Sequence, residues 1–84
     1  AVWCGCMLET GVGRAANIAL AALPGFTLPG DISGSDRFFA RDITTEPIVM
    51  HDGVVDVPTG PGFGVEIDPG ALAACTVGVS EVAP

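Results

Sequence analysis

The clearest chemical spacing in this chain lies in a glycine-bearing loop, Gly11-Val12-Gly13-Arg14-Ala15-Ala16. The run fits the G-x-G-x-x-A pattern of dinucleotide-binding proteins, in which backbone N–H groups at a helix start hold a pyrophosphate. Asp31 follows at roughly 20 residues, where such proteins place the acid that binds a ribose. Glu9, however, would put a carboxylate beside that phosphate. The pattern therefore favours a turn that opens a helix, whose N–H groups could instead face a substrate carboxylate.

Three cysteines and one histidine could form a zinc site on paper: Cys4, Cys6, Cys75 and His51. The spacer that normally separates the two members of a zinc-ligand pair is absent between Cys4 and Cys6. A disulfide between these two would be badly strained, because they lie on one short predicted strand. Reduced thiols are the simplest account, and they predict a cytoplasmic protein.

Serines and the histidine also suggest a hydrolase triad of Ser33, Ser35 and His51. The G-x-S-x-G turn that exposes the nucleophile in one large class of hydrolases is absent. His51 also falls in a predicted hairpin turn, where a solvated histidine is the usual finding. Hydrolysis is therefore disfavoured.

The elements that position these residues alternate in the first third of the chain. Residues 1–7 predict a buried strand, residues 13–23 a helix, and residues 26–31 a second short strand. A strand, a helix and a strand in this order form a βαβ unit, which needs a parallel sheet. Since 84 residues cannot supply that sheet, we expect the chain to be the tail of a larger α/β enzyme.

The predicted helix has one narrow stripe that holds Arg14, Asn17 and Ala21, and most of its remaining surface is apolar. A helix of this kind lies wedged between neighbours on several sides, as in the outer ring of a barrel. An amphipathic membrane helix would instead need a basic polar face.

The second half of the chain has the signals of antiparallel structure. Residues 32–45 predict a polar crossover, and residues 47–57 predict a hairpin with a tight turn at His51-Asp52-Gly53. We therefore expect an antiparallel β or α+β layer over residues 46–76.

Two further elements complete that layer. Val65-Glu66-Ile67 predicts a last strand, after an irregular loop rich in proline and glycine. Asp68 is placed to cap a final helix over residues 69–75.

Charge and hydrophobicity argue against several classes of function. Ten acidic residues, three arginines and no lysine give a net charge of −7, which disfavours nucleic acid and anionic membrane surfaces as partners. No apolar run approaches the roughly 20 residues of a membrane span. Hydrophobic residues make up 49% of the chain, which suits surfaces that further protein covers. Alone, the chain is expected to be marginally stable.

One stretch resembles a known family: Trp3-Cys4-Gly5-Cys6-Met7-Leu8-Glu9-Thr10-Gly11-Val12-Gly13-Arg14-Ala15-Ala16-Asn17. It is similar to the late barrel segment of the enolase superfamily, muconate-lactonizing subgroup. The nearest branch is that of o-succinylbenzoate synthase and N-acylamino-acid racemase. The likeness continues, in family order and spacing, through residues 26–31, 35–38, 46–47 and 57–65.

The resemblance implies a (β/α)7β barrel closed by an α+β capping domain that is built from both chain ends. Residues 1–31 would be the last strands and helix of the barrel, and residues 32–45 the crossover. Residues 46–76 would be the C-terminal segment of the capping domain, and residues 77–84 a tail. The expected fold class is α/β, as the C-terminal fragment of such a barrel.

The implied chemistry is removal of a proton α to a carboxylate by a lysine, with Mg²⁺ stabilising the enediolate. Loss of water gives o-succinylbenzoate for menaquinone synthesis, whereas reprotonation racemises an N-acylamino acid. The family's lysines and metal ligands lie on earlier strands, and this chain has no lysine. The chain alone is therefore expected to be inactive. It would need the N-terminal part of the same polypeptide, and the full-length protein is expected to be a homo-oligomer.

The resemblance assigns substrate contact to five residues: Gly5, Cys6, Leu8, Glu9 and Phe38. The backbone at Cys6 and the side chains of Leu8 and Phe38 would touch the succinyl or acyl part of a small carboxylate substrate. Glu9 would be a charge partner of the lysine on the preceding strand. Relatives usually carry glycine in place of Cys6, so its side chain could crowd the substrate or forbid a glycine-only backbone angle.

Two other classes of function stay open. The chain could be a non-catalytic structural or interaction piece that keeps a barrel-like sequence for packing. It could also be a dinucleotide-binding βαβ unit built on Gly11 to Gly13. Within the leading reading, the residues present do not decide between dehydration and racemisation.

Overall fold

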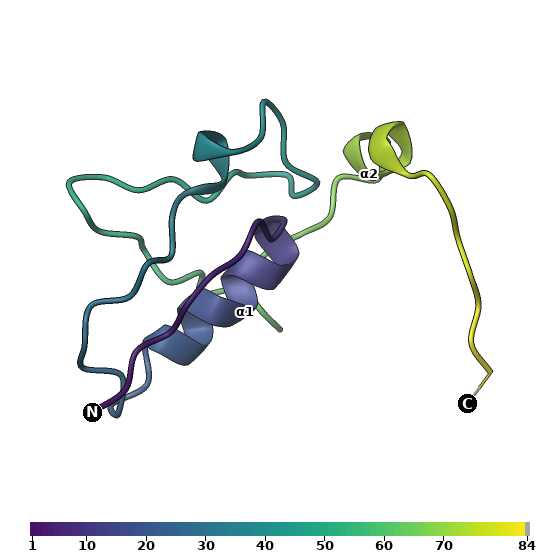
Figure 1. Cartoon of the computed structure of the whole chain (residues 1–84). Coiled ribbons are helices and arrows are strands. Elements are labelled where there is room, and N and C mark those ends of the chain that lie inside the picture. The colour runs from purple at the N-terminus through teal and green to yellow at the C-terminus, as the bar shows by residue number, and fades with distance from the viewer. Residues whose placement is uncertain (84) are drawn as a thin grey trace.

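The computed structural model describes residues 1–83 and places one long helix among extended segments (Figure 1). Helix α1 spans Gly11–Ala21, the 3₁₀ helix η1 spans Ser35–Arg37, and helix α2 spans Pro69–Cys75. No regular strand occurs among residues 1–83, which hold two isolated β-bridges. The extended segments are therefore held by loop-to-loop hydrogen bonds and by a small core that includes α1.

Helix α1 forms close to the predicted range of residues 13–23, but it begins and ends two residues earlier, at Gly11 and Ala21. Its apolar residues Ala15 and Ile18 are buried against Ile48 from the second half of the chain. Partly buried hydrophobic side chains surround this small core: Ile32, Val55 and Val65. The core thus joins α1 to segments that come later in the sequence.

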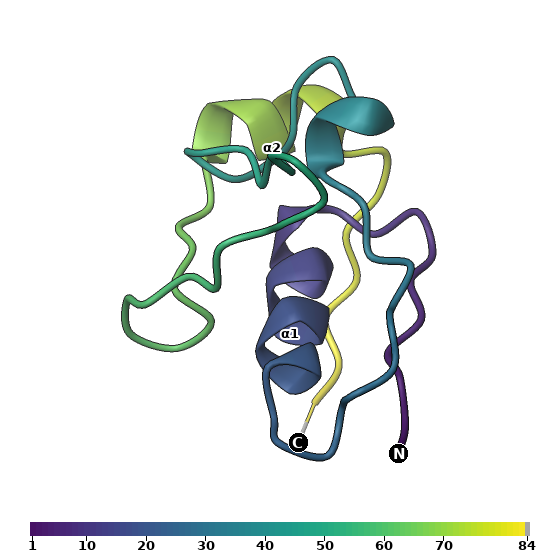
Figure 2. The same cartoon turned by 90° about the vertical axis from the view of Figure 1, so that its left-hand side faces the viewer.

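The predicted strands at residues 1–7 and 26–31 are wrong as regular strands, although the two segments run parallel and side by side (Figure 2). The Val2 N–H donates to the Gly25 carbonyl at 3.3 Å, and the Leu28 N–H donates to the Val2 carbonyl at 3.2 Å. In a regular parallel ladder these two partners of one residue would lie two positions apart, not three. The extra residue interrupts the register.

The same pair of segments stays close farther along. A side chain in place of Gly30 would meet the Cys4 carbonyl oxygen at 2.9 Å, so the two backbones approach closely there. Parallel strands usually occur in sheets where neighbours pair with both edges. Among the described residues, these two short segments have only each other as partners. They form too few backbone hydrogen bonds to make a regular β-ladder.

The tight turn predicted at His51-Asp52-Gly53 is confirmed, whereas the regular strands of the hairpin over residues 47–57 are not formed. His51 and Val54 exchange two backbone hydrogen bonds, at 2.8 and 2.9 Å. Asp52 and Gly53 have φ values of 51° and 77°, the positive pair that a type I′ turn requires. The turn depends only on its own residues, whereas a two-stranded hairpin without further strands is only marginally stable.

The strand predicted at residues 65–67 is also wrong as a regular strand. It contributes one antiparallel bridge, between Ile67 and Thr44, with backbone hydrogen bonds of 2.9 and 2.7 Å on either side. Its partner lies in the predicted polar crossover, residues 32–45. The crossover is therefore held to the last part of the chain.

The final helix predicted over residues 69–75 is confirmed. Asp68 caps α2, because one of its carboxylate oxygens accepts from the Gly70 and Ala71 N–H groups at 3.0 and 3.2 Å. The Arg41 guanidinium pairs with Asp68, and this bond, with the helix N–H groups, lowers the pKa of the Asp68 carboxyl.

After α2 the chain continues as an extended, exposed segment over residues 77–83, which stands apart from α1 (Figure 1). Residue 84, the last of the predicted tail, lies outside the described residues. Within the described part of the chain, neither the length nor the hydropathy of any helix suffices to cross a membrane.

The start of α1 is capped by a residue from far along the chain. Thr10 occupies the N-cap position but makes no side-chain cap hydrogen bond. Instead, Asp42 Oδ1 accepts from the Gly11 N–H at 2.9 Å and from the Ile43 N–H at 2.7 Å. A side chain at Gly11 would meet Asp42 Oδ2 and two atoms of Thr44 at 2.7 Å, so this approach requires glycine.

We expect Asp42→Ala to destabilise the protein by about 1–2 kcal/mol, the usual cost of losing a helix cap. Burial disfavours the charge of Asp42, but the Gly11 and Ile43 N–H groups hold the pKa of this carboxyl below its ordinary value. The cap's contribution is therefore complete above the unfolded pKa of about 3.9 and is lost as the pH falls through the lower folded pKa.

Urea unfolding at pH 7 and at a pH below 3 measures both effects. The control is Asp36→Ala, which removes an exposed carboxylate near the same segment. A loss of stability that is equal for the two variants, or that does not shrink in acid, would show that Asp42 does not act as the cap.

Candidate functional site

A small pocket lies where the loop before α1 meets the first part of the crossover. Its volume is about 270 Å³, and it is lined by Cys6, Met7, Leu8, Asp31, Ser33 and Phe38. Three of the five residues expected to contact substrate are thus brought together: Cys6, Leu8 and Phe38. Leu8 and Phe38 are 67% and 45% exposed, so both offer apolar surface to a ligand.

The other two predicted residues lie beside this pocket. Gly5 directly precedes its first lining residue. The Glu9 carboxylate turns back to its own loop, where its oxygens accept from the Met7 N–H at 2.8 and 2.9 Å and from the Cys6 thiol at 3.1 Å. The thiol bond and then the Met7 N–H lower the pKa of Glu9. Glu9 shapes the loop here, and its pairing with a lysine stays a prediction.

Arg14, which was not among the predicted site residues, connects the walls of the pocket. Its side chain is completely buried. One terminal nitrogen, Nη1, donates to the Ser33 carbonyl at 2.7 Å and to Cys6 Sγ at 3.1 Å, while Nη2 donates to the Glu9 carbonyl at 2.9 Å. The guanidinium carbon also lies 5.5 Å from the centre of the Phe38 ring, a cation–π contact.

A sequence signal for Arg14 did exist. It is the one charged residue of a helix whose surface is otherwise mostly apolar, sharing its stripe with Asn17 and Ala21. Such a residue can be the solvated edge of a helix or a buried hydrogen-bond donor, and helical periodicity does not separate the two cases. The structure shows the second.

The Cys6 thiol lies on the pocket wall between Glu9 and Arg14. Burial is the main cause that raises the pKa of this thiol, and its hydrogen bond to Glu9 adds to the rise, while the Arg14 charge opposes it. The thiol is therefore protonated at neutral pH and acts as a hydrogen-bond donor. Its backbone has no positive φ, so the expectation of a glycine-only angle is wrong, whereas crowding of the substrate stays a prediction.

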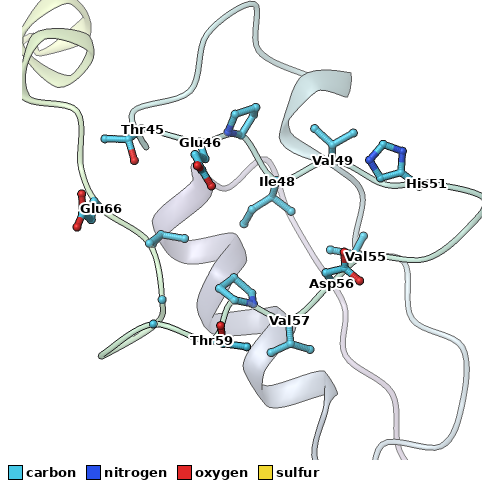
Figure 3. A pocket seen from close by; sticks show the side chains of 15 residues that line it. Thr45, Glu46, Ile48, Val49, His51, Val55, Asp56, Val57, Thr59 and Glu66 are labelled. Atoms are coloured by element: carbon cyan, nitrogen blue, oxygen red, sulfur yellow. The ribbon is translucent and has the colours of Figure 1, made fainter.

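A larger cavity of about 740 Å³ lies between the residues around the tight turn and the loop that follows them (Figure 3). Three carboxylates line it, Glu46, Asp56 and Glu66, and none of the five residues predicted to contact substrate does. An acidic wall repels a carboxylate substrate. The smaller pocket has one carboxylate, Asp31, and three of its lining residues contact the Arg14 guanidinium, so it is the better candidate.

Three alternatives from the sequence are not assembled. Among residues 1–83, no three side chains of His, Cys, Asp or Glu gather closely enough to hold a metal ion, zinc and Mg²⁺ included. The Gly11 N–H, which would face a pyrophosphate, already donates to the Asp42 carboxylate. Of the hydrolase residues, Ser35 is buried while His51 is exposed in the turn.

Comparison with known proteins identifies relatives of the whole segment. The sequence matches the family described as enolase C-terminal domain-like over residues 1–71. It is 63% identical over 75 residues to an N-succinylamino acid racemase of Amycolatopsis sp. This alignment covers 89% of this chain and 20% of the relative. It is also 53% identical over 81 residues to an o-succinylbenzoate synthase of Listeria innocua. That alignment covers 96% of this chain and 22% of the relative.

Solved structures of the enolase superfamily have the same shape in this region. A superfamily member from Listeria innocua matches with a TM-score of 0.83 and 56% identity, over 87% of this chain and 20% of that one. A probable mandelate racemase from Alicyclobacillus acidocaldarius matches with a TM-score of 0.86 and 38% identity, over 93% and 21%. The chain thus spans about a fifth of the length of these relatives. With a match over residues 1–71, the chain belongs to the enolase C-terminal domain-like family.

Proposed function

We propose that the chain supplies one wall of the substrate pocket of an enzyme that removes a proton α to a carboxylate. The reaction is that of an o-succinylbenzoate synthase, an N-acylamino-acid racemase, or both. The observation that carries the proposal is the pocket that unites Cys6, Leu8 and Phe38. The names of the relatives, a racemase and a synthase, support the same two reactions.

In this proposal the segment belongs to a longer, cytoplasmic and homo-oligomeric polypeptide. Residues 1–31 form the last strands and helix of its barrel, residues 32–45 the crossover, and residues 46–76 part of the capping domain, with a tail after them. The many exposed large hydrophobic side chains support this arrangement, since further protein would cover them. Outside the pocket, those on the first part of the chain are Val2, Trp3, Leu20, Leu23 and Leu28.

The chain's own residues bind and orient the substrate in this scheme. Leu8 and Phe38 offer apolar surface to the succinyl or acyl group, and the wall at Cys6 limits the room available to it. The lysine base lies outside this segment, which has none. Mg²⁺ would stabilise the enediolate when bound, but the described residues do not fit a magnesium site, so its ligands also lie elsewhere.

The direct test uses the full-length polypeptide that carries this segment. Purified with Mg²⁺, it should form o-succinylbenzoate from its hydrated precursor, or racemise N-succinylamino acids, and chelation should abolish turnover until Mg²⁺ is restored. Absence of both activities in a folded, metal-loaded protein would contradict the proposal and would favour a structural or interaction role.

Cys6→Gly tests whether this position limits the size of the substrate. We expect the variant to gain about tenfold in kcat/KM for a bulky N-acyl group relative to a small one, because a small change of volume in a pocket is worth that much. Cys75→Ala is the matched control, since Cys75 is an exposed thiol on α2. If the ratio for the two acyl groups is the same in wild type and Cys6→Gly, position 6 does not touch the substrate.

A further inference from the structure

We infer that Arg14 is a positioning residue that sets the distance between the Leu8 side and the Phe38 side of the pocket. The inference rests on the proposed function, because it concerns how the same pocket holds the succinyl or acyl group. Arg14 does not touch the substrate itself, since its side chain is completely buried.

The contacts of Arg14 reach every segment that lines the pocket. From the loop before α1 come Cys6 Sγ at 3.1 Å and the Glu9 carbonyl at 2.9 Å. From the start of the crossover comes the Ser33 carbonyl at 2.7 Å, and Phe38 lies with its ring centre 5.5 Å from the guanidinium carbon. Cys6, Ser33 and Phe38 themselves line the pocket, so one side chain ties its two walls together.

The chemistry of these contacts favours arginine over other side chains. Two terminal nitrogens, held in one rigid plane, donate to two carbonyls on different segments. A lysine ammonium has three donors, but they sit on a single freely rotating nitrogen and cannot span the same two positions in a fixed geometry. The flat face of the same group is free to stack on an aromatic ring. Lysine would keep the charge but lose the fixed geometry.

The hydrogen-bonding capacity of the buried Arg14 side chain is not fully used. Its Nε is buried and has no hydrogen-bond partner among the described residues. A buried donor without a partner is costly. A role in holding the two walls in register accounts for an arginine at this place.

The consequence for the pocket follows from the position of Phe38. Its ring is about half exposed and lies against the guanidinium, so a shift of the guanidinium moves the ring. Leu8 lies in the same loop as the Glu9 carbonyl that Arg14 holds. A misplacement of about 1 Å is enough to weaken a reaction that depends on orientation.

The test is a double-mutant cycle in the full-length enzyme, with Arg14→Lys, Phe38→Leu and the double variant. We expect Arg14→Lys to raise KM about tenfold and to change kcat less than threefold, because it loosens substrate binding. In the Phe38→Leu background the same change should have a much smaller effect, since the two residues act together. Arg37→Lys, at an exposed arginine of η1, is the control and should leave KM unchanged.

Two kinetic outcomes would overturn the inference. One is an unchanged KM in folded Arg14→Lys. The other is a rise in KM that is equally large with and without Phe38, which would show that Arg14 does not act through the ring. Lack of activity in the wild type would instead count against the proposed function alone.

The Cys6 thiol gives a second readout that does not depend on turnover. Freed from Arg14, the loop should expose this thiol, and we expect Arg14→Lys to alkylate at Cys6 about tenfold faster with iodoacetamide at pH 9, because a locally opened site reacts more often. Peptide mass spectrometry reports Cys6 itself, with Cys75 in the same sample as the reference. An unchanged rate at Cys6 would show that Arg14 does not hold the loop.

Discussion

Replacing Arg14 with leucine is expected to lower the free energy of unfolding by about 3 kcal/mol, even though leucine fills part of the same volume. The change removes three donated hydrogen bonds, to Ser33, Glu9 and Cys6, from a completely buried position. It leaves two backbone carbonyls without this partner, and each such loss costs more than a neutral surface bond. Urea unfolding of the full-length protein measures the difference.

The matched control for this experiment is Arg37→Leu. Arg37 lies in η1 and is exposed, so its replacement should change stability by less than about 0.5 kcal/mol. If both leucine variants cost the same, the network around Arg14 does not hold the loop and the crossover together.

Leu8→Asp is expected to reduce kcat/KM by about a hundredfold, which corresponds to about 2.7 kcal/mol. The substitution removes apolar contact with the succinyl or acyl group, and it adds a negative charge beside a substrate that carries one or two carboxylates. Leu8 lines the pocket and takes no part in the small core of Ala15, Ile18 and Ile48, so the fold should tolerate the aspartate. Steady-state kinetics and a thermal melt of the same sample separate the two effects.

Val77→Asp is the control for this charge. Val77 is fully exposed in the segment after α2, away from the pocket, and should accept the same substitution without loss of activity. A loss of only a few-fold in Leu8→Asp, or an equal loss in Val77→Asp, would mean that Leu8 does not face the substrate.

The predictable parts of the fold are those with local causes. Asp68 and the alanine-rich run after it define α2, and Asp52-Gly53 defines a turn that needs two positive φ values. The strands could not be predicted in the same way. A parallel strand at residues 1–7 depends on partners at both edges, and its hydrophobic pattern does not say whether those partners are present.

The candidate site likewise has residues that the sequence predicts and residues that it does not. Cys6, Leu8 and Phe38 came from the resemblance to a family, and the structure gathers them around one pocket. Arg14 and Asp42 were missed, because each acts on residues distant in sequence: Arg14 on Ser33, and Asp42 on the start of α1. The hydrophobic periodicity of a single helix or loop does not reveal contacts between residues that are far apart in the sequence.

The central claim, that Cys6 stands in the wall of a pocket for an N-acylated carboxylate, is open to affinity labelling. An N-bromoacetylamino acid resembles such a substrate, and the Cys6 thiolate can displace its bromide to form a thioether. Labelling is run at pH 9 to raise the fraction of thiolate above that at neutral pH, because burial raises the pKa of this thiol. We predict saturable labelling of Cys6 in the full-length protein, and protection by an N-succinylamino acid. Labelling of the exposed Cys75 alone, or labelling of Cys6 that the succinyl compound does not slow, would contradict the account.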